Sequence, residues 1–346
     1  MKKKFYKILQ KQLQKFGVYT QYYASDRAIH YHLKSKPIVI QNYELNKVSK
    51  SIQVANNHSF YQSLLRKFVP DWDIKIEAAQ FIFGAGMGAS SLDCYRRVNI
   101  NGNSYFEKVY FSEHDDLKRI KWFHLNAYNS ISRFGITAPA LHNLFEGKAF
   151  VITYFQFLDL LPLVHSEVEE NFISISKKLY LASLEEHSIK DGNDIPEYVK
   201  SFQSHFEYKN KLAEAKHKLT GHGVDFQEFE KAVKASKLIF THGDIQEKNA
   251  FKNSMIIDFD TFGIYPIGFD VAFCCFRLLI TDKIQNLVPE WLENNFKKDI
   301  TVDDWEQFDR NFTFFLFVFL ATYFKRESYT YLEERLAEKI KYYNRH

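Results

Sequence analysis

The segment THGDIQEKNAF, at 241–251, limits what this chain can fold into more than any other stretch of it. It follows the short apolar run KLIF, and the chain then reads IIDFD at 256–260. Short apolar runs bounded by polar residues are typical of buried strands, and side chains at strand ends are positioned by the scaffold behind them. The pattern therefore predicts two strands whose ends carry a concentration of carboxylates.

A tight hairpin is predicted between the two halves of this segment. The residues AF, then Lys252 and Asn253, then SMII have the strand, turn and strand composition of a hairpin. Such a hairpin brings Asp258 back beside Asn249. Carboxylate and amide oxygens are the hard ligands that Mg²⁺ prefers. We therefore predict Asn249 and Asp258 as metal ligands, with Asp260 as a second carboxylate that acts directly or through water.

The residues HGD, four more residues and Asn249 match a known catalytic pattern. Protein kinases carry H-R-D-x-x-x-x-N in their catalytic loop, and this chain has Gly where that pattern has Arg. The longer stretch THGDIQEKNAF…MIIDFDTFGIYPIGFDVA resembles the signature of the aminoglycoside phosphotransferase and choline kinase family. Members of that family are small-molecule kinases with a protein-kinase-like fold, and the resemblance covers roughly 74–280.

The resemblance implies a role for each residue of the motif. Asp244 is implied as the catalytic base, and Asn249 and Asp258 as the ligands of Mg²⁺. His242 is implied as a structural residue that braces the loop. Asp270 stands before a predicted helix and is implied as a support of the catalytic loop. Asp is also a residue type that caps helices, so Asp270 could cap this one.

A glycine-rich turn supplies the candidate nucleotide-binding loop. FGAGMGASS places three glycines between two strand-like runs, and glycines let backbone N–H groups approach phosphate oxygens closely. The turn lacks the G-K-[ST] ending of a Walker loop and does not open directly into a helix, which excludes the P-loop and Rossmann interpretations. The predicted ATP-binding glycines are Gly84, Gly86 and Gly88.

Lys108, in SYFEKVYF, follows one hairpin later, where a kinase-like lobe places the lysine that pairs with nucleotide phosphates. Kinases pair that lysine with an acid well inside the next helix, but LKRIKWFHLNA has no acid in its middle. Glu113, at the start of that helix, is the best remaining partner. The connector VITYFQFLDL resembles the family's hinge, so backbone groups from Thr153 to Phe155 are predicted to meet the adenine.

Three zones follow from these patterns. Residues 1–73 are predicted to form an extension that begins with a basic amphipathic helix, and residues 74–158 a strand-rich, nucleotide-binding lobe. Residues 159–346 are predicted to form a mainly helical lobe for catalysis and acceptor binding. The fold class is therefore α+β, bilobal and protein-kinase-like. The basic helix either touches an anionic membrane surface weakly or packs on its own domain.

Composition excludes several other classes of protein. The net charge of +4 is small for 346 residues, and no Lys/Arg patch interleaved with aromatics indicates a nucleic-acid partner. Three Cys form neither a metal pattern nor a disulfide framework, which favours the reducing cytoplasm. The longest apolar run, FTFFLFVFLATYF, is shorter than the roughly 20 residues that span a bilayer.

The sequence thus predicts a kinase that uses ATP and Mg²⁺ to phosphorylate a hydroxyl group of a small molecule. The acceptor stays open between an aminoglycoside, choline or another amino alcohol, and a sugar. The predicted acceptor region, 160–237, carries both acidic clusters and aromatics. Two alternatives stay open: a pseudokinase that binds nucleotide without turnover, and a protein kinase. The absence of an A-P-E segment after IIDFD counts against the second. The oligomeric state and the choice between ATP and GTP are also open.

Overall fold

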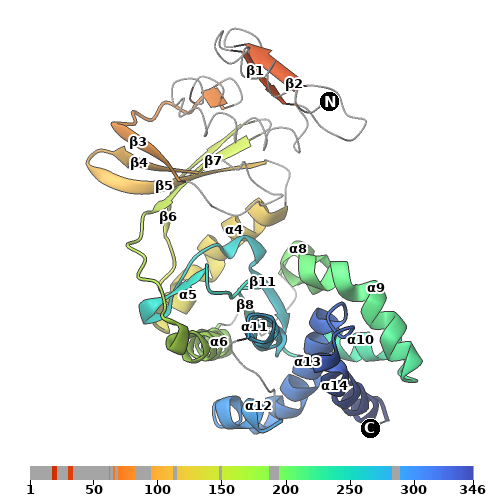
Figure 1. Ribbon diagram of the computed structural model, residues 1–346. Helices are drawn as coiled ribbons and strands as arrows, with labels where there is room; N and C mark the ends of the chain where they lie inside the picture. The colour runs from red at the N-terminus through yellow and green to blue at the C-terminus, as the bar shows by residue number, and fades with distance from the viewer. Residues whose placement is uncertain are drawn as a thin grey trace. The chain divides into compact units, whose positions relative to one another are not determined.

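The computed structural model describes residues 18–21, 30–33, 62, 65–66, 69–82, 95–111, 115–147, 150–186, 195–282 and 289–345. The chain divides into two compact units, one of 1–117 with 139–158 and one of 118–138 with 159–346. The first holds a five-stranded sheet and the second is mainly helical (Figure 1). The predicted α+β fold, with a β-rich amino-terminal part and a helical carboxy-terminal part, is confirmed. Residues 118–138, predicted within the β-rich lobe, group with the helical unit.

The sheet of the first unit is antiparallel and has the strand order β3-β4-β5-β7-β6. Its strands are β3 (Ala78–Ile82), β4 (Tyr95–Ile100), β5 (Asn103–Phe111), β6 (Leu141–Glu146) and β7 (Phe150–Gln156). The hairpin of β4 and β5 turns at Asn101 and Gly102, which both have positive φ, 50° and 75°. A tight two-residue turn needs such angles, which Asn and Gly adopt most readily. The hairpin predicted from the Asn-Gly pair is confirmed.

The amino-terminal extension contains a small hairpin of its own. Strands β1 (Val18–Gln21) and β2 (His30–Leu33) pair antiparallel. Residues 62, 65 and 66 are helical. The amphipathic helix predicted at the start of the chain lies outside the described residues.

The second unit is built on helices that pack around two long apolar ones. The helices are α4 (Asp115–Asn126), which begins just before the division, α5 (Tyr128–Arg133), α6 (Val168–Glu185), α8 (Glu197–Lys200), α9 (Phe206–Gly221), α10 (Phe226–Lys234), α11 (Phe269–Ile280), α12 (Pro289–Phe296), α13 (Val302–Leu320) and α14 (Glu327–Arg345). The buried residues of α11 and α13 form one core, and α13 contains most of the apolar run noted in the sequence. No helix among the described residues is long and apolar enough to cross a membrane.

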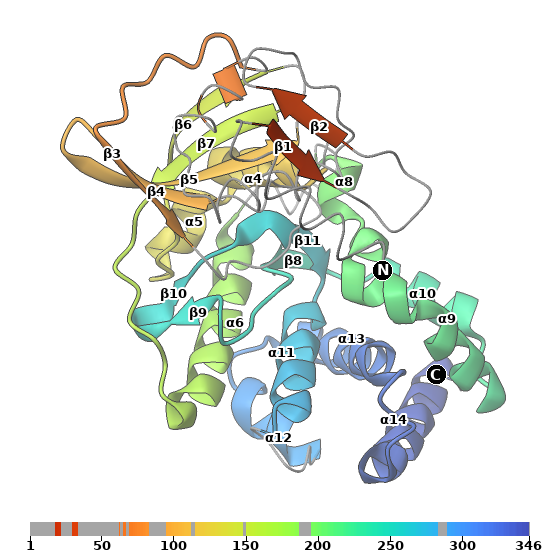
Figure 2. The same cartoon turned by 45° about the horizontal axis from the view of Figure 1, so that its top comes forward.

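Two short strand pairs lie within the helical unit and carry the motif. Strand β8 (Leu238–Thr241) pairs antiparallel with β11 (Gly263–Pro266). Strand β9 (Ala250–Phe251) pairs with β10 (Met255–Ile256). Figure 2 shows β8 and β11 above α11, and β9 and β10 beside α6. The hairpin predicted from AF, Lys252, Asn253 and SMII is confirmed.

Candidate active site

The residues His242, Gly243 and Asp244 begin where β8 ends. The strand is apolar and mostly buried, and its last residue, Thr241, pairs with Gly263 of β11. Residues 241–246 are all buried, although most of them are polar. Buried polar groups need hydrogen-bond partners, so the partners of this loop define the site.

Asp270 anchors the backbone of the loop. Its two carboxylate oxygens accept the N–H groups of His242, at 2.7 Å, and Gly243, at 2.9 Å. Asp270 lies in the first turn of α11 and is 3% exposed. Burial raises its pKa to about 7, the two N–H bonds oppose that rise, and the nearby Asp244 carboxylate adds to it. One carboxylate thus fixes two successive peptide groups of the loop against the start of a core helix.

Gly243 occupies a position that only glycine fits. Its φ is +81°, and a Cβ atom there would lie 2.6 Å from the backbone oxygen of Thr261. The hydroxyl of Thr261 in turn donates to the backbone oxygen of His242 at 2.9 Å. The glycine of HGD is therefore explained by a left-handed backbone and by the close approach of the segment after β10.

Gly243→Ala is expected to lower the free energy of unfolding by more than the roughly 1–2 kcal/mol of a left-handed non-glycine residue, because the new methyl group meets a backbone atom. Two glycines of the same chain separate these causes. Gly223 has φ +77° but open space, and Gly221 has neither restriction. Denaturant unfolding of the three alanine variants should rank the loss as Gly243 above Gly223 above Gly221. Equal losses at Gly243 and Gly223 would contradict the steric part.

Two histidines brace the loop from opposite sides. The backbone N–H of Asp244 donates to Nδ1 of His242, and its Nε2 lies 3.0 Å from the backbone oxygen of Ile257. Nε2 of His205 lies 2.6 Å from the backbone oxygen of Gly243. Burial lowers the pKa of His242 to about 4 and that of His205 to about 3. Both rings are therefore neutral near pH 7, and each donates its Nε2 proton to a carbonyl.

The Asp244 carboxylate is held by two amide side chains. Nε2 of Gln246 lies 2.6 Å from each carboxylate oxygen. Nδ2 of Asn249 donates to Oδ2 and to the backbone oxygen of Asp244, both at 2.9 Å. The pKa of Asp244 is raised to about 6. Burial is the main cause and the charge of Asp258 adds to it, while the hydrogen bonds from the two amides oppose the shift. The result is a fixed carboxylate whose pKa lies close to neutrality, as suits a general base.

The β9–β10 hairpin brings Asp258 to this loop. The N–H of Ile257 donates to the backbone oxygen of Asn249 at 2.9 Å, so the next residue, Asp258, follows directly beside Asn249. Asp258 is exposed and has left-handed backbone angles, φ 68° and ψ 58°. Such angles are uncommon for residues other than glycine and cluster at functional sites.

Aromatic packing holds the backbone that follows Asp258. The ring of Phe259 stacks on Phe123 of α4, with centroids 4.2 Å apart, and meets His242 edge-on at 4.6 Å. Phe262 stacks on Trp122 of the same helix. These contacts lie within one unit, and they fix where the carboxylate of Asp258 stands.

The amide of Asn249 has the orientation that a cation requires. Two hydrogen bonds of its side chain use Nδ2 as the donor to Asp244, which leaves Oδ1 as the atom suited to be a ligand. Oδ1 of Asn249 and the exposed carboxylate of Asp258 are both oxygen donors of the type that Mg²⁺ prefers. Asp260, 9% exposed, follows two residues later. No cluster of three or more His, Cys, Asp or Glu residues suited to a metal occurs in the described part of the chain, so the fit rests on these mixed ligands.

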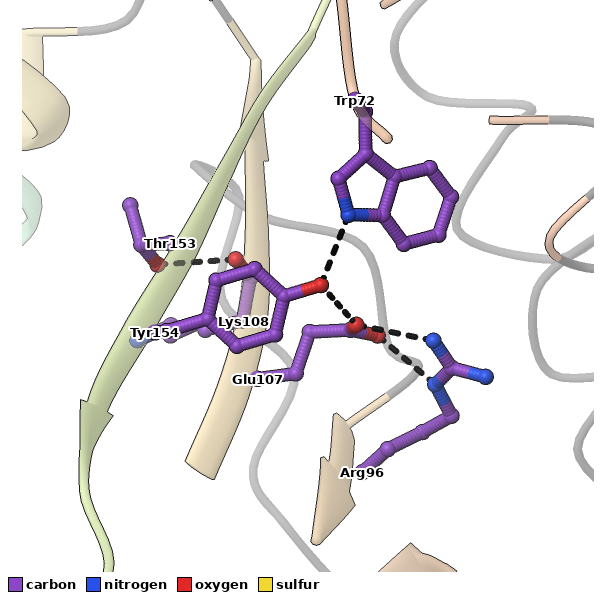
Figure 3. Close-up of polar contacts among 6 residues, drawn as sticks. All are labelled: Trp72, Arg96, Glu107, Lys108, Thr153 and Tyr154. Atoms are coloured by element: carbon purple, nitrogen blue, oxygen red, sulfur yellow. Dashed lines mark hydrogen bonds and ion pairs between the residues drawn. The ribbon is translucent and has the colours of Figure 1, made fainter. Parts of the chain in front are cut away.

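Lys108 lies on β5 of the sheet unit. Its side chain is 6% exposed, and Nζ lies over the rings of Tyr110, at 4.9 Å, and Tyr95, at 5.7 Å. The hydroxyl of Thr153 donates to the backbone oxygen of Lys108 at 2.8 Å (Figure 3). This hydrogen bond from β7 therefore holds the backbone of Lys108 in place on β5.

The acid next to Lys108 belongs to the other face of the sheet. Successive residues of a strand point to opposite faces, and Glu107 receives a two-bond ion pair from Arg96, at 2.7 and 2.8 Å. Figure 3 shows the hydroxyl of Tyr154 donating to the same carboxylate while accepting from Trp72. Arg96 and Glu107 are both fully buried. This network is structural, and Glu107 is not positioned as a partner of the Lys108 ammonium.

Thr153 and Phe155, the predicted adenine contacts, lie inside β7, which has β5 on one side and β6 on the other. The backbone groups of a central strand are used by its two neighbours. The ladder with β5 ends at Gln156, and the connector begins after it. The contact of residues 153–155 with adenine stays a prediction, and the sequence VITYFQFLDL does not mark where strand pairing stops.

Four predicted residues lie outside the described residues: the glycines Gly84, Gly86 and Gly88, and the acid Glu113. Two residues of the site were not anticipated. Gln246 could have been found, because it stands two residues after Asp244 in the same loop. His205 carries no local signal, since it precedes the loop by a long stretch of helix and acts through a backbone oxygen.

No protein-family profile matches the chain, and no curated protein sequence does. Among solved structures it is similar to a microcompartment-associated aminopropanol kinase, with 11% identity, 80% of this chain and 94% of that chain covered, and a TM-score of 0.42. It is also similar to an aminoglycoside phosphotransferase from Streptomyces rimosus ATCC10970, solved with ADP and streptomycin. The identity is 13%, the match covers 76% of this chain and 98% of that chain, and the TM-score is 0.42. A third match is a choline kinase from Streptococcus pneumoniae, with 10% identity, 81% of this chain and 99% of that chain covered, and a TM-score of 0.40. Similarity at this level does not determine activity or substrate.

Proposed function

We propose that this chain is a phosphotransferase that uses ATP and Mg²⁺ to phosphorylate a hydroxyl group of a small molecule. One observation carries the proposal: a buried Asp244 carboxylate, held by Gln246 and Asn249, in a loop beside Asp258. Phosphoryl transfer depends mostly on positioning and electrostatics rather than on covalent chemistry. A carboxylate this firmly held suits that requirement.

Asp244 is the proposed base. Its carboxylate accepts the proton of the acceptor hydroxyl, or orients that hydroxyl, while Gln246 and Asn249 prevent the side chain from turning away. His242, His205 and Asp270 act on the backbone of the loop and are proposed as positioning residues. Their hydrogen bonds leave the loop few alternative conformations.

The metal would be held by Oδ1 of Asn249 and the carboxylate of Asp258, with Asp260 as a further ligand directly or through water. A bound Mg²⁺ neutralises charge on the nucleotide phosphates. Because the cation carries a double charge, it also offsets the repulsion between the carboxylates of Asp258 and Asp244.

The sheet unit is the proposed nucleotide-binding part. Lys108 is proposed to pair with nucleotide phosphates, and Gly84, Gly86 and Gly88 to supply backbone N–H groups. The adenine contacts are proposed for residues 153–155 and for the connector that begins after Gln156. The buried free thiols of Cys274 and Cys275 suit a reducing compartment, so we propose a cytoplasmic location.

The activity is expected to fall as the pH drops through about 6. Asp244 accepts a proton only when ionised, and burial raises its pKa to about 6. Below that value kcat/KM should fall about tenfold per pH unit, as for one essential base. A bound cation favours the ionised form, so the midpoint under saturating Mg²⁺ should lie at or below 6. Initial rates between pH 5 and 8 at constant ionic strength measure it, and a rate that rises toward pH 5 would contradict the assignment.

The proposed function is tested by ADP formation with ATP and Mg²⁺ and, in parallel, with EDTA. The acceptors are an aminoglycoside, choline, ethanolamine, serine and simple sugars, and calorimetry measures the binding of ATP alone. We expect turnover that depends on one class of acceptor and on Mg²⁺, together with ATP binding. A chain that binds no nucleotide with or without Mg²⁺ would sink the proposal.

A further inference from the structure

A pocket of about 210 Å³ opens on the helical unit beside the catalytic loop. Its walls come from the start of α6, the loop residues Gln246, Glu247 and Lys248, and the last turns of α11. Helices α6 and α11 pack against each other in this unit (Figures 1 and 2). Gln246 is shared between the pocket and the site, because its amide donates to both oxygens of Asp244. A molecule in the pocket would therefore lie one side chain away from the proposed base.

Arg277 is the unusual residue of this pocket. It lies in the last turn of α11, and its Nε atom is buried with no hydrogen-bond partner. No ion pair joins its guanidinium to an acid anywhere in the described part of the chain, although surface lysines on α9 and α10 have such partners. The favourable effect of a cation at a helix carboxy terminus is smaller than the cost of a buried, charged donor that has no partner.

The charged residues that line the pocket are Arg277, Lys248 and Glu247. Outside the lining, Arg277 repels Lys211, whose pKa is lowered mainly by burial; Glu207, 3.1 Å from the lysine ammonium, opposes that shift. Lys248, which also lines the pocket, is exposed, and its charge acts to lower the pKa of Asp244. Glu247 is the one acid among the lining residues, and it too is exposed. The interior of the pocket is therefore cationic.

We infer that this pocket holds the acceptor and that Arg277 selects an acceptor with an anionic group, a carboxylate or a phosphate, in addition to its hydroxyl. That the bound anion is the acceptor rests on the proposed function, whereas anion binding by Arg277 rests on the pocket alone. A guanidinium presents a planar fork of N–H donors that matches the two oxygens of a carboxylate or phosphate. An anion in the pocket supplies the partner that Arg277 lacks. A cationic acceptor, such as an aminoglycoside or choline, meets repulsion at the same place.

The test compares acceptors that differ by one anionic group. Serine is ethanolamine with a carboxylate, and glycerol 3-phosphate is glycerol with a phosphate, so the two pairs also separate the two anion types. Binding is measured by calorimetry with saturating ADP and Mg²⁺, and ADP formation from ATP is measured separately. The variants are Arg277→Gln, which removes the charge, and Arg277→Lys, which keeps it without the fork. Arg335→Gln on α14 is the matched control, and melting curves verify that each variant is folded.

The wild type is expected to bind at least one anionic compound more tightly than its neutral partner. Arg277→Gln should remove roughly 10- to 100-fold of that preference, the range of a charge-assisted hydrogen bond. Arg277→Lys should retain part of it, and Arg335→Gln all of it. No preference for an anion in the wild type, or a preference that survives Arg277→Gln, would overturn the inference. ADP formation with a neutral or cationic acceptor alone would overturn it while the proposed function stands. A preference for anions without ADP formation would contradict the proposed function and the acceptor role of the pocket, and would leave only anion binding by Arg277 in place.

Discussion

Asp244→Ala is expected to reduce kcat by about 10²–10⁴-fold, the range that a positioned general base contributes, while ATP affinity changes little. The carboxylate is the only group in the loop with both the basicity and the fixed position that the reaction needs. Its pKa, near 6, leaves it ionised at pH 7, and two amides hold it in place. The side chain is not among the proposed nucleotide contacts, so binding of ATP should persist.

Asp244→Asn keeps the shape of the side chain but loses the base, so it should show a similar loss of kcat. The new amide also presents N–H groups to Gln246 and Asn249, which are donors already. Asp303→Ala, at an exposed site in the first turn of α13, is the matched control. Turnover and calorimetric ATP binding are measured on all three variants. Normal turnover in Asp244→Ala would remove this residue from the mechanism.

The parts of the site that are local in sequence could be predicted from it. The Asn101-Gly102 turn and the β9–β10 hairpin depend on a few adjacent residues whose backbone preferences are strong. The hairpin alone brings Asp258 beside Asn249. The proximity of these two residues could therefore be predicted from one short segment of the sequence. Gly243 is another local signal, since the left-handed backbone that it adopts excludes most other residues.

The parts that depend on distant residues could not be predicted in the same way. His205 and Gly243 are in contact although α9, α10 and β8 separate them in the sequence, and no spacing rule links the two. The last paired residue of β7 is set by the lengths of β5 and β6 rather than by its own apolar sequence. This is why the sequence did not show that Thr153 and Phe155 lie inside the paired part of β7. Arg277 is one cation on an apolar helix, and only the pocket beside it indicates that this side chain could bind an anion.

The buried ion pair of the sheet unit predicts the largest loss of stability. Glu107→Ala is expected to lower the free energy of unfolding by about 3–5 kcal/mol, because it leaves the fully buried guanidinium of Arg96 without its counter-charge. The hydroxyl of Tyr154 also loses its acceptor. Denaturant unfolding of the full chain, followed by circular dichroism, measures the change. Because the chain has two units, the transition of the sheet unit has to be analysed separately from that of the helical unit.

Replacement of both partners separates the cost of the orphaned charge from the value of the pair. Arg96→Met with Glu107→Leu removes both charges, and apolar residues of similar size often restore the stability of a buried pair. The double variant should therefore be more stable than Glu107→Ala, although the hydroxyl of Tyr154 still lacks its acceptor. Both variants lack the hydrogen bond from Tyr154 to Glu107, so they differ mainly in the charge of Arg96. A double variant less stable than Glu107→Ala would therefore mean that the orphaned guanidinium is not the main cost of losing Glu107, and that apolar side chains do not fill the space of the pair.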